Sequence, residues 1–261
     1  IVRFSEDGQR LMTSGRRGLR VWKVALPDES PWPETIAADG VFLTSHDTYH
    51  ADATPSLDRI AFVNVDGLAS VIEADNPEHR IDLAAANVQR VAISPDGKWV
   101  VTVPQSGRGL VVWNAYTGQR VTDKHPTAAA TMMSFSTNGS WLAGSNTDGR
   151  FLWHTGTWDV ERQNTWLADS PGVIAFSPND KLVVMPRDRF SLGLVDSETL
   201  QTLVALDAGD RRLASSATFS PDGTRLAITS RGSFEVWDLP DLRRRLRDLN
   251  LDWGQPQPAQ P

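Results

Sequence analysis

Apolar and polar positions alternate along several stretches of the chain, and each stretch ends in the same short polar turn. These stretches are VRFSEDG, VAISPDG, MSFSTNG, IAFSPND and ATFSPDG, which begin at Val2, Val91, Met133, Ile174 and Ala217. In each of them apolar residues at every second position run into Ser, and Asp or Asn follows two residues later. A period of two predicts a half-buried β-strand, and the Ser and Asp or Asn residues predict a tight turn after it.

The turns recur at a near-constant spacing, so the chain is built from repeats. Their central residues are separated by 89, 42, 41 and 43 positions, and are Asp7, Asp96, Asn138, Asn179 and Asp222. The first separation is two periods long, and a degenerate copy, PSLD at 55–58 followed by RIAFVNVDG, fills it. The sequence therefore contains six copies of a unit of about 40 to 45 residues.

Each copy continues past its turn in the same way. A second apolar stretch follows, then a short turn that contains glycine, then a third stretch, and in several copies a weaker fourth one. In four copies the third stretch ends in tryptophan, at Trp22, Trp113, Trp153 and Trp237; the second and fifth copies end near Ile72 and Val195. Four short strands per unit is the size of one propeller blade, so we predict an all-β fold, a β-propeller of four-stranded antiparallel blades. Its repeats are predicted near 1–40, 41–84, 85–124, 125–165, 166–207 and 208–239.

The end of the chain departs from the repeat. Leucines follow Pro240 at spacings of four and three, at Leu242, Leu246 and Leu249. This pattern predicts a short amphipathic helix within 240–253, with Trp253 as its anchor. The Pro- and Gln-rich stretch 254–261 is expected to be disordered.

The sixth copy reaches only its third strand before this helix begins. A propeller closes when one blade is completed by strands from both ends of the chain. We therefore expect the missing outer strand to lie upstream of Ile1 in a longer protein, whose intact propeller would have room for seven blades.

Composition limits the function classes that fit. The chain has 26 Lys and Arg against 32 Asp and Glu, a net charge of −6, which argues against nucleic-acid binding through bulk charge. It has no cysteine, which excludes disulfides and thiolate chemistry but leaves the cellular compartment open. No apolar run reaches the roughly 18 residues of a membrane span. Ten tryptophans point to a repeated structural position that takes an indole.

The period, the turn and the terminal tryptophan together resemble the WD-repeat β-propeller family over residues 1–239. The literal Trp-Asp pair occurs only at Trp237-Asp238. The resemblance implies a hydrogen-bonded structural set within a blade, and only the fourth copy matches it in full, with His125, Ser145, Asp148 and Trp153. The segment WDLPDLRRRLRDLNLDW also resembles the C-terminal ends of propellers in large bacterial multidomain proteins, some of which carry a Ser/Thr kinase domain upstream.

Catalytic motifs are missing from the chain. It contains no GxSxG, no phosphate-binding glycine loop and no HExxH, and its five histidines are scattered. His46 and His50 are spaced by four beside Asp47 and Asp52, but this segment is predicted as a solvated loop that enters a strand, not as a metal site. We therefore predict a protein that is not an enzyme and has no metal or cofactor.

Charge separates the two sides of the predicted propeller, because the resemblance implies that successive hairpin turns alternate between them. Arginines occupy the second-to-third turns and the loops that lead into blades, at Arg16, Arg17, Arg90, Arg108, Arg150, Arg187, Arg189, Arg211, Arg212 and Arg231. The turns of the opposite side carry acidic residues that include Asp7, Asp58, Asp96, Asp180 and Asp222. Arginine is suited to bidentate capture of carboxylate or phosphate. The first hypothesis is thus a protein-interaction scaffold whose arginine-rich side binds acidic or phosphorylated segments of partner proteins.

Three other interpretations stay open at this point. The arginines can be ordinary solvated loop residues. The propeller can bind or hydrolyse a small molecule in a central funnel, or it can be a structural accessory to an upstream catalytic domain. The family resemblance does not choose among them, since one fold serves many functions.

Overall fold

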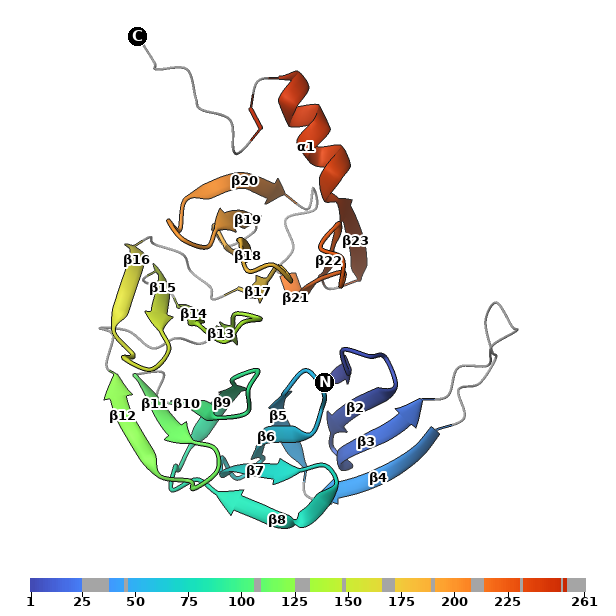
Figure 1. The fold of residues 1–261 in the computed structure, drawn as a ribbon, viewed down its shortest axis with the longest axis vertical. Helices are drawn as coiled ribbons and strands as arrows, with labels where there is room; N and C mark the ends of the chain where they lie inside the picture. The colour runs from blue at the N-terminus through green and yellow to red at the C-terminus, as the bar shows by residue number, and fades with distance from the viewer. Residues whose placement is uncertain are drawn as a thin grey trace.

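The computed structural model describes residues 1–24, 38–44, 47–105, 109–124, 132–146, 149–165, 172–188, 191–207, 214–230, 232–249 and 251–252. These residues form six antiparallel sheets, which follow one another in chain order around a centre, as Figure 1 shows. The predicted all-β propeller fold is confirmed. Each sheet is one blade, and blades 1 to 6 are numbered along the chain.

The first three blades have four strands each, and consecutive strands are neighbours in every one. Blade 1 consists of β1 (Val2–Phe4), β2 (Arg10–Gly15), β3 (Gly18–Val24) and β4 (Ala38–Thr44). Blade 2 consists of β5 (Thr48–Ala53), β6 (Arg59–Asn64), β7 (Ala69–Glu73) and β8 (Asn76–Asp82). Blade 3 consists of β9 (Val88–Ile93), β10 (Trp99–Pro104), β11 (Leu110–Asn114) and β12 (Arg120–Lys124).

The last three blades follow the same plan, except that the sixth has three strands among the described residues. Blade 4 consists of β13 (Met132–Phe135), β14 (Trp141–Ser145), β15 (Gly149–His154) and β16 (Val160–Thr165). Blade 5 consists of β17 (Ala175–Phe176), β18 (Leu182–Pro186), β19 (Ser191–Asp196) and β20 (Thr202–Asp207). Blade 6 consists of β21 (Ala214–Phe219), β22 (Arg225–Ser230) and β23 (Ser233–Asp238). In Figure 1 the first strand of each blade lies toward the centre and the fourth toward the rim.

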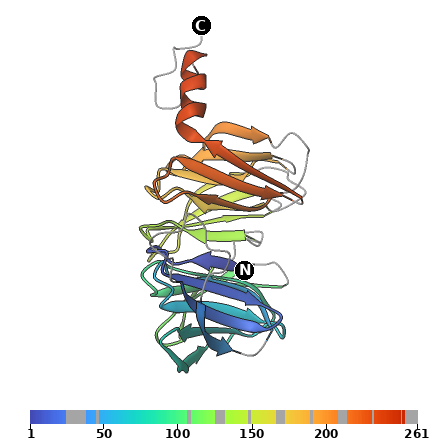
Figure 2. The same ribbon diagram turned by 90° about the vertical axis from the view of Figure 1, so that its right-hand side faces the viewer.

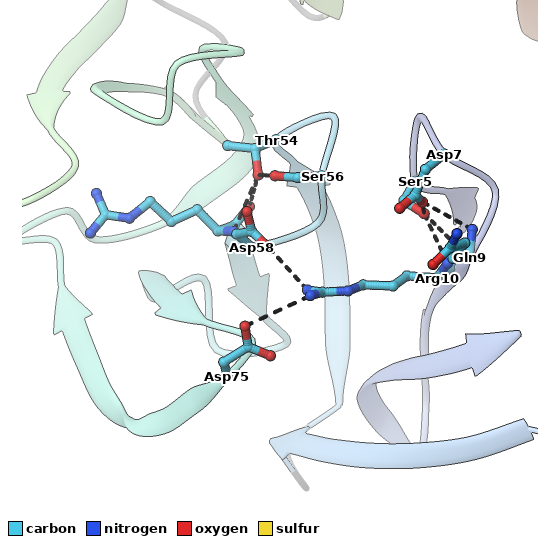
Figure 3. Close-up of polar contacts among 9 residues, drawn as sticks. Ser5, Asp7, Gln9, Arg10, Thr54, Ser56, Asp58 and Asp75 are labelled. Carbon is cyan, nitrogen blue, oxygen red and sulfur yellow. Dashed lines mark hydrogen bonds and ion pairs between the residues drawn. The ribbon is translucent and has the colours of Figure 1, made fainter.

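The repeated polar turn has one hydrogen-bond pattern in five of the six blades. In blade 1 the Ser5 hydroxyl donates to Asp7 Oδ1 at 2.6 Å and accepts from the Arg10 amide at 2.8 Å, while Asp7 Oδ1 accepts from the Gln9 amide (Figure 3). The same serine-to-Asp or Asn bond occurs in four other blades, at Ser94–Asp96, Ser136–Asn138, Ser177–Asn179 and Ser220–Asp222. These side chains satisfy turn amides, which is why the residue types recur with the period of the fold.

The degenerate copy keeps the turn with other residues. Thr54 takes the place of the serine, and its hydroxyl accepts from the Arg59 amide at 3.2 Å. Leu57 stands where Gly8 and Gly97 stand in blades 1 and 3, and all three have a left-handed backbone, with φ of 60°, 71° and 68°. The leucine bears a strain that glycine avoids, and its fully buried side chain offsets that cost.

The core lies between the blades. The described residues contain five clusters of buried apolar side chains, and each cluster joins two blades that are consecutive in the chain. Between blades 3 and 4, for example, Val101 and Val112 pack against Leu142 and Trp153. Each blade thus needs a neighbour on both of its faces to bury its apolar residues.

The predicted C-terminal helix is present as α1 (Leu239–Asp248), which extends beyond blade 6 in Figure 2. Asp238 caps its N-terminus by accepting from the Asp241 amide at 2.9 Å, and proline occupies its first turn. Leu239 is buried against blades 5 and 6, whereas Leu249, which follows the last residue of the helix, is exposed. Trp253, the expected anchor, lies outside the described residues. Asp252 instead connects the residues after the helix to α1, by accepting a hydrogen bond from Arg243 Nε at 3.1 Å.

Candidate interaction surfaces

The two sides of the propeller differ in the turns that they carry. Among the described turns, those between first and second strands and those between third and fourth strands lie on one side, because the strands are antiparallel, and those between second and third strands lie on the other. We call the first the acidic side, after the turn residues Asp7, Asp58, Asp75, Asp96 and Asp222. We call the second the arginine side, after Arg16 and Arg17 in the turn between β2 and β3.

A hollow of about 310 Å³ opens on the acidic side between blades 2 and 3. It is formed by four different turns and the strand ends beside them. Its lining residues are Thr54, Ser56, Asp58, Arg59, Glu73, Asp75, Pro95, Asp96, Gly97 and Tyr116. No single repeat contains this set, so the hollow could not be predicted from spacing within one copy.

Arg59 forms the floor of this hollow. Its guanidinium donates to Glu73 Oε1 at 2.8 Å within blade 2 and to the Gly97 carbonyl at 3.2 Å in blade 3. The same group lies 3.7 Å from the ring centre of Tyr116, in cation–π contact. The hydrogen bond from Arg59 lowers the pKa of Glu73, and the nearby His79 contributes to the same direction. The Arg59 guanidinium therefore links two blades, and its hydrogen bonds are made to other residues of the chain.

The acidic rim of the hollow is more open. Asp58 and Asp75 are exposed, and Arg10 of blade 1 reaches them across the blade interface, at 2.9 Å and 3.8 Å (Figure 3). Asp96 sits in its own turn, where it accepts from the Ser94 hydroxyl and the Lys98 amide.

The hollow keeps an excess of negative charge. The four carboxylates, Asp58, Glu73, Asp75 and Asp96, face two guanidinium groups, Arg10 and Arg59, so the group carries a net charge of −2. The exposed ring of Tyr116 flanks these carboxylates. An acidic hollow with an aromatic edge suits the head of a lysine or arginine side chain.

The arginine side is only partly defined by the described residues. Arg16, Arg17 and Arg187 are exposed there, and none of them makes an ion pair with another described residue. Arg90 is half-buried near His50 of β5, the innermost strand of blade 2. The other predicted members lie outside the described residues: Arg108, Arg189, Arg211, Arg212 and Arg231.

Arg150 does not fit the surface role predicted for it. It lies in β15 and is 3% exposed, with Nε donating to the Pro186 carbonyl at 2.7 Å and Nη1 to Thr202 Oγ1 at 3.2 Å. Burial, together with the nearby Arg187, lowers the pKa of Arg150 to about 10. Arg150 is three residues before Trp153, as Leu110 is before Trp113, so it occupies an interface position between blades 4 and 5 instead of a turn.

The first strand of each blade lies toward the centre of the propeller (Figure 1), where a binding or catalytic site in a central funnel would have to be. His50 lies within β5, so its segment is a strand and not the predicted loop; His46 lies outside the described residues. Burial, and then the nearby Arg90, lower the pKa of His50 to about 4. Asp52 accepts from Arg3 Nη1 at 2.5 Å and from the Ile93 amide at 3.0 Å, so it holds blades 1, 2 and 3 together. No three His, Asp or Glu side chains among the described residues are placed to hold a metal ion.

Two of the four residues predicted as the structural set of blade 4 lie among the described residues. Ser145 and Trp153 are buried in adjacent strands, and His125 and Asp148 lie outside the described residues. A different pair was missed from the sequence. The indole of Trp113 donates to Thr102 Oγ1 at 2.8 Å, and Trp22 makes the same bond to Thr13.

Comparison with known proteins gives no closer assignment. No protein-family model matches the chain, and no curated protein sequence matches it. Within the described part of the chain, no helix has both the length and the apolar character that a membrane crossing requires.

Proposed function

We propose that this propeller is a non-catalytic protein-binding platform of WD-repeat type, and that the acidic hollow between blades 2 and 3 receives a lysine or arginine of a partner protein. The observation that carries the proposal is the hollow itself: Asp58, Asp75 and Asp96 line one opening together with Tyr116. Its net charge of −2 complements a cationic side chain. The β-propeller fold supports the platform role, since a rigid scaffold that presents loops commonly serves binding.

The architecture favours recognition of an extended segment over catalysis. The floor group, Arg59, is held by Glu73, Gly97 and Tyr116, and it is not available as an acid or an electrophile. The rim carboxylates are solvated, and an exposed carboxylate contributes modest affinity by itself. A partner would therefore gain most from one cationic residue in the hollow and from further contacts along the acidic side.

A peptide array tests this proposal. One set of peptides carries a single Lys or Arg among uncharged residues, and a matched set carries Glu in its place. The chain should bind the cationic set. Peptides that bind are then measured by fluorescence anisotropy against the double variant Asp58→Asn/Asp75→Asn, which should lower affinity by roughly tenfold, about 1.4 kcal/mol.

Two controls make the result specific to the hollow. Asp66→Asn removes one exposed carboxylate from the opposite side and should leave affinity unchanged. Tyr116→Ala should weaken binding while it leaves the net charge intact. Preference for the Glu set, or equal binding by the double variant and the parent chain, would remove the hollow as the docking site.

A second candidate is the binding of an acidic or phosphorylated segment on the arginine side. Arg16, Arg17 and Arg187 support it, since all three are exposed and lack ion-pair partners among the described residues. The test is anisotropy with phosphoserine peptides and their unphosphorylated counterparts. The triple variant Arg16→Glu/Arg17→Glu/Arg187→Glu should abolish any preference for phosphate, and an unchanged preference would refute this candidate.

A further inference from the structure

Two arginines occupy the same position of the repeat and are held in different ways. Arg10 follows Ser5 of its turn by five residues, and Arg59 follows Thr54 of the next turn by five residues. Each guanidinium reaches across to the following blade. The side chain of Arg59 is 9% exposed and that of Arg10 is 30% exposed, so Arg10 is the more accessible of two equivalent groups.

The Arg10 guanidinium contacts two exposed carboxylates. Its Nη1 lies 2.9 Å from Asp58 Oδ1 and its Nη2 lies 3.8 Å from Asp75 Oδ2, and these two side chains are 60% and 82% exposed. Figure 3 shows the end of the Arg10 side chain between the two carboxylates. Among the described residues this guanidinium makes no other hydrogen bond and no ring contact. Because an exposed ion pair contributes little to stability, Arg10 can leave these carboxylates at a small cost in free energy.

The residue at the place of Tyr116 explains the difference between the two arginines. Asp75 stands in blade 2 where Tyr116 stands in blade 3, since each follows the last residue of its third strand by two positions. The tyrosine ring covers the Arg59 guanidinium at 3.7 Å, whereas an aspartate in that place offers charge but no cover. Asp58 and Asp75 also line the hollow between blades 2 and 3. A cation that enters the hollow therefore meets carboxylates that already hold a guanidinium.

The two shared carboxylates are placed for a group with two nitrogens. Asp58 lies in the turn between β5 and β6, and Asp75 lies in the turn between β7 and β8. Arg10 spans the two turns with Nη1 on one carboxylate and Nη2 on the other. A guanidinium carries its nitrogens in a rigid plane, whereas the single nitrogen of a lysine is a point charge. The rim of the hollow thus already has the geometry of a bound arginine.

We propose that the partner residue received by the acidic hollow is an arginine and not a lysine, and that it displaces Arg10 from Asp58 and Asp75. This inference rests on the proposed function, since it concerns the same hollow. Arg10 is a resident competitor, and the partner's guanidinium replaces it by forming the same two contacts. The exposed ring of Tyr116 adds a surface on which a planar guanidinium can stack.

Matched peptides test the identity of the partner residue. Peptides that bind in the array are made in pairs that differ only by Arg or Lys at the cationic position, and both are measured by fluorescence anisotropy. The arginine member should bind roughly fivefold tighter, because a lysine recovers only one of the two contacts. Equal affinities within the pairs, or a preference for lysine, would overturn this inference and leave the proposed function standing.

The second experiment removes the competitor. Arg10→Gln takes the guanidinium away from Asp58 and Asp75, and the variant should bind the arginine peptide roughly two- to fivefold more tightly than the parent chain. Arg225→Gln is the matched control. Arg225 holds the same repeat position in blade 6, five residues after its turn serine, and it is exposed. Its substitution removes the same charge from the same side of the propeller and should leave affinity unchanged.

Two other results with Arg10→Gln would overturn the inference. Weaker binding would mean that Arg10 supports the rim of the hollow and does not compete for it. Unchanged affinity would mean that the partner's cation lies beside Arg10, against Asp96 and Tyr116, without displacing it.

The Arg10 side chain can also be followed directly. Its Nε–H resonance in a proton–nitrogen spectrum is assigned by its loss from the spectrum of Arg10→Gln. Addition of the arginine peptide to the parent chain should shift this resonance toward those of the exposed Arg16 and Arg17. A resonance that stays in place while the peptide binds would contradict displacement.

The peptide array, repeated with Arg10→Gln, separates failure of this inference from failure of the proposed function. If the parent chain binds no cationic peptide and Arg10→Gln binds the arginine set, the resident guanidinium masks the hollow and the inference is supported. If neither chain binds, both proposals fail. If the parent binds and Asp58→Asn/Asp75→Asn weakens binding, but Arg10→Gln does not strengthen it, only the inference fails.

Discussion

The indole nitrogen of Trp113 donates a hydrogen bond to Thr102 Oγ1 at 2.8 Å across adjacent strands of blade 3. Both side chains are buried. The repeated tryptophan therefore places a polar N–H in the interface between blades. A threonine on the adjacent strand, two residues after the residue that pairs with the tryptophan, accepts its hydrogen bond. In blades 4 and 6 the equivalent positions hold Gly144 and Ile228, which offer no side-chain acceptor.

Thr102→Val should destabilise the chain by about 1–2 kcal/mol, because it keeps the shape of the side chain and leaves the Trp113 N–H buried without its acceptor. Urea unfolding measures the change. Thr13→Val is the matched control in blade 1, where Trp22 is half-buried and water can replace the lost acceptor, so its cost should be smaller. Equal costs at the two sites would show that burial of the indole does not set the penalty.

Most of the fold could be predicted from the sequence because its determinants are local. Ser5 and Asp7 specify their turn through bonds that span two and five residues, and the same bonds recur in five of the six copies. The candidate hollow could not be predicted in this way. It depends on Arg59 and Tyr116 from different repeats, and only the packing of blade 2 on blade 3 brings them to 3.7 Å.

Arg150 shows why the arginine pattern was interpreted too broadly. Counting turn residues placed it beside the glycine of a second-to-third turn, on the surface. The register of β14 and β15 pairs Arg150 with Ser145 and Trp153 with Leu142, which puts the arginine within the strand. Its distance from the repeated tryptophan was the signal that could have identified an interface position.

Arg59→Met should destabilise the chain by about 1–3 kcal/mol at neutral pH, because it removes charged hydrogen bonds to Glu73 and to the Gly97 carbonyl. The pKa of Glu73 should return toward its ordinary value, as a carbon-detected NMR titration would show. A carboxyl whose pKa is lowered on folding contributes stability above its unfolded pKa and loses it as pH falls through the folded value. The difference between the variant and the parent should therefore shrink on acidification below about pH 4.

Arg59→Lys is the matched control for this prediction. It keeps the positive charge but loses the planar fork that reaches two blades and stacks on Tyr116. Its stability should lie between those of the parent and the methionine variant. If the lysine variant is as stable as the parent, positive charge alone would account for the stability that Arg59 contributes.

Arg150→Glu should cost about 3–5 kcal/mol, because it places an unpaired carboxylate against the Pro186 carbonyl at a buried interface. Arg187→Glu, which changes an exposed neighbour by the same charge, should change stability by no more than about 0.5 kcal/mol. Thermal unfolding of the two variants gives the comparison. A small effect of the first substitution would mean that the interface between blades 4 and 5 opens to water more readily than its packing indicates.

His50 should make the stability of the chain depend on pH in mildly acidic solution. Burial and the nearby Arg90 lower its pKa to about 4, and Asp52 opposes them only in part. In the unfolded chain the imidazole titrates near its ordinary value of 6.5, so between these two values the unfolded state binds one more proton than the native state. Stability should therefore fall as pH is lowered from 6.5 to about 4, by roughly 3 kcal/mol in total, and this contribution should stop changing below that.

His50→Gln removes the titrating group and should flatten this part of the stability profile, while slopes from carboxylates such as Glu73 persist below it. Urea unfolding at intervals between pH 7 and pH 4 measures both profiles, and the imidazole resonances of the folded chain report the pKa directly. Parallel profiles for the parent and the variant would contradict the prediction. They would mean that the native state admits a proton at His50, with Asp52 compensating for Arg90 more fully than the packing around β5 and β9 allows.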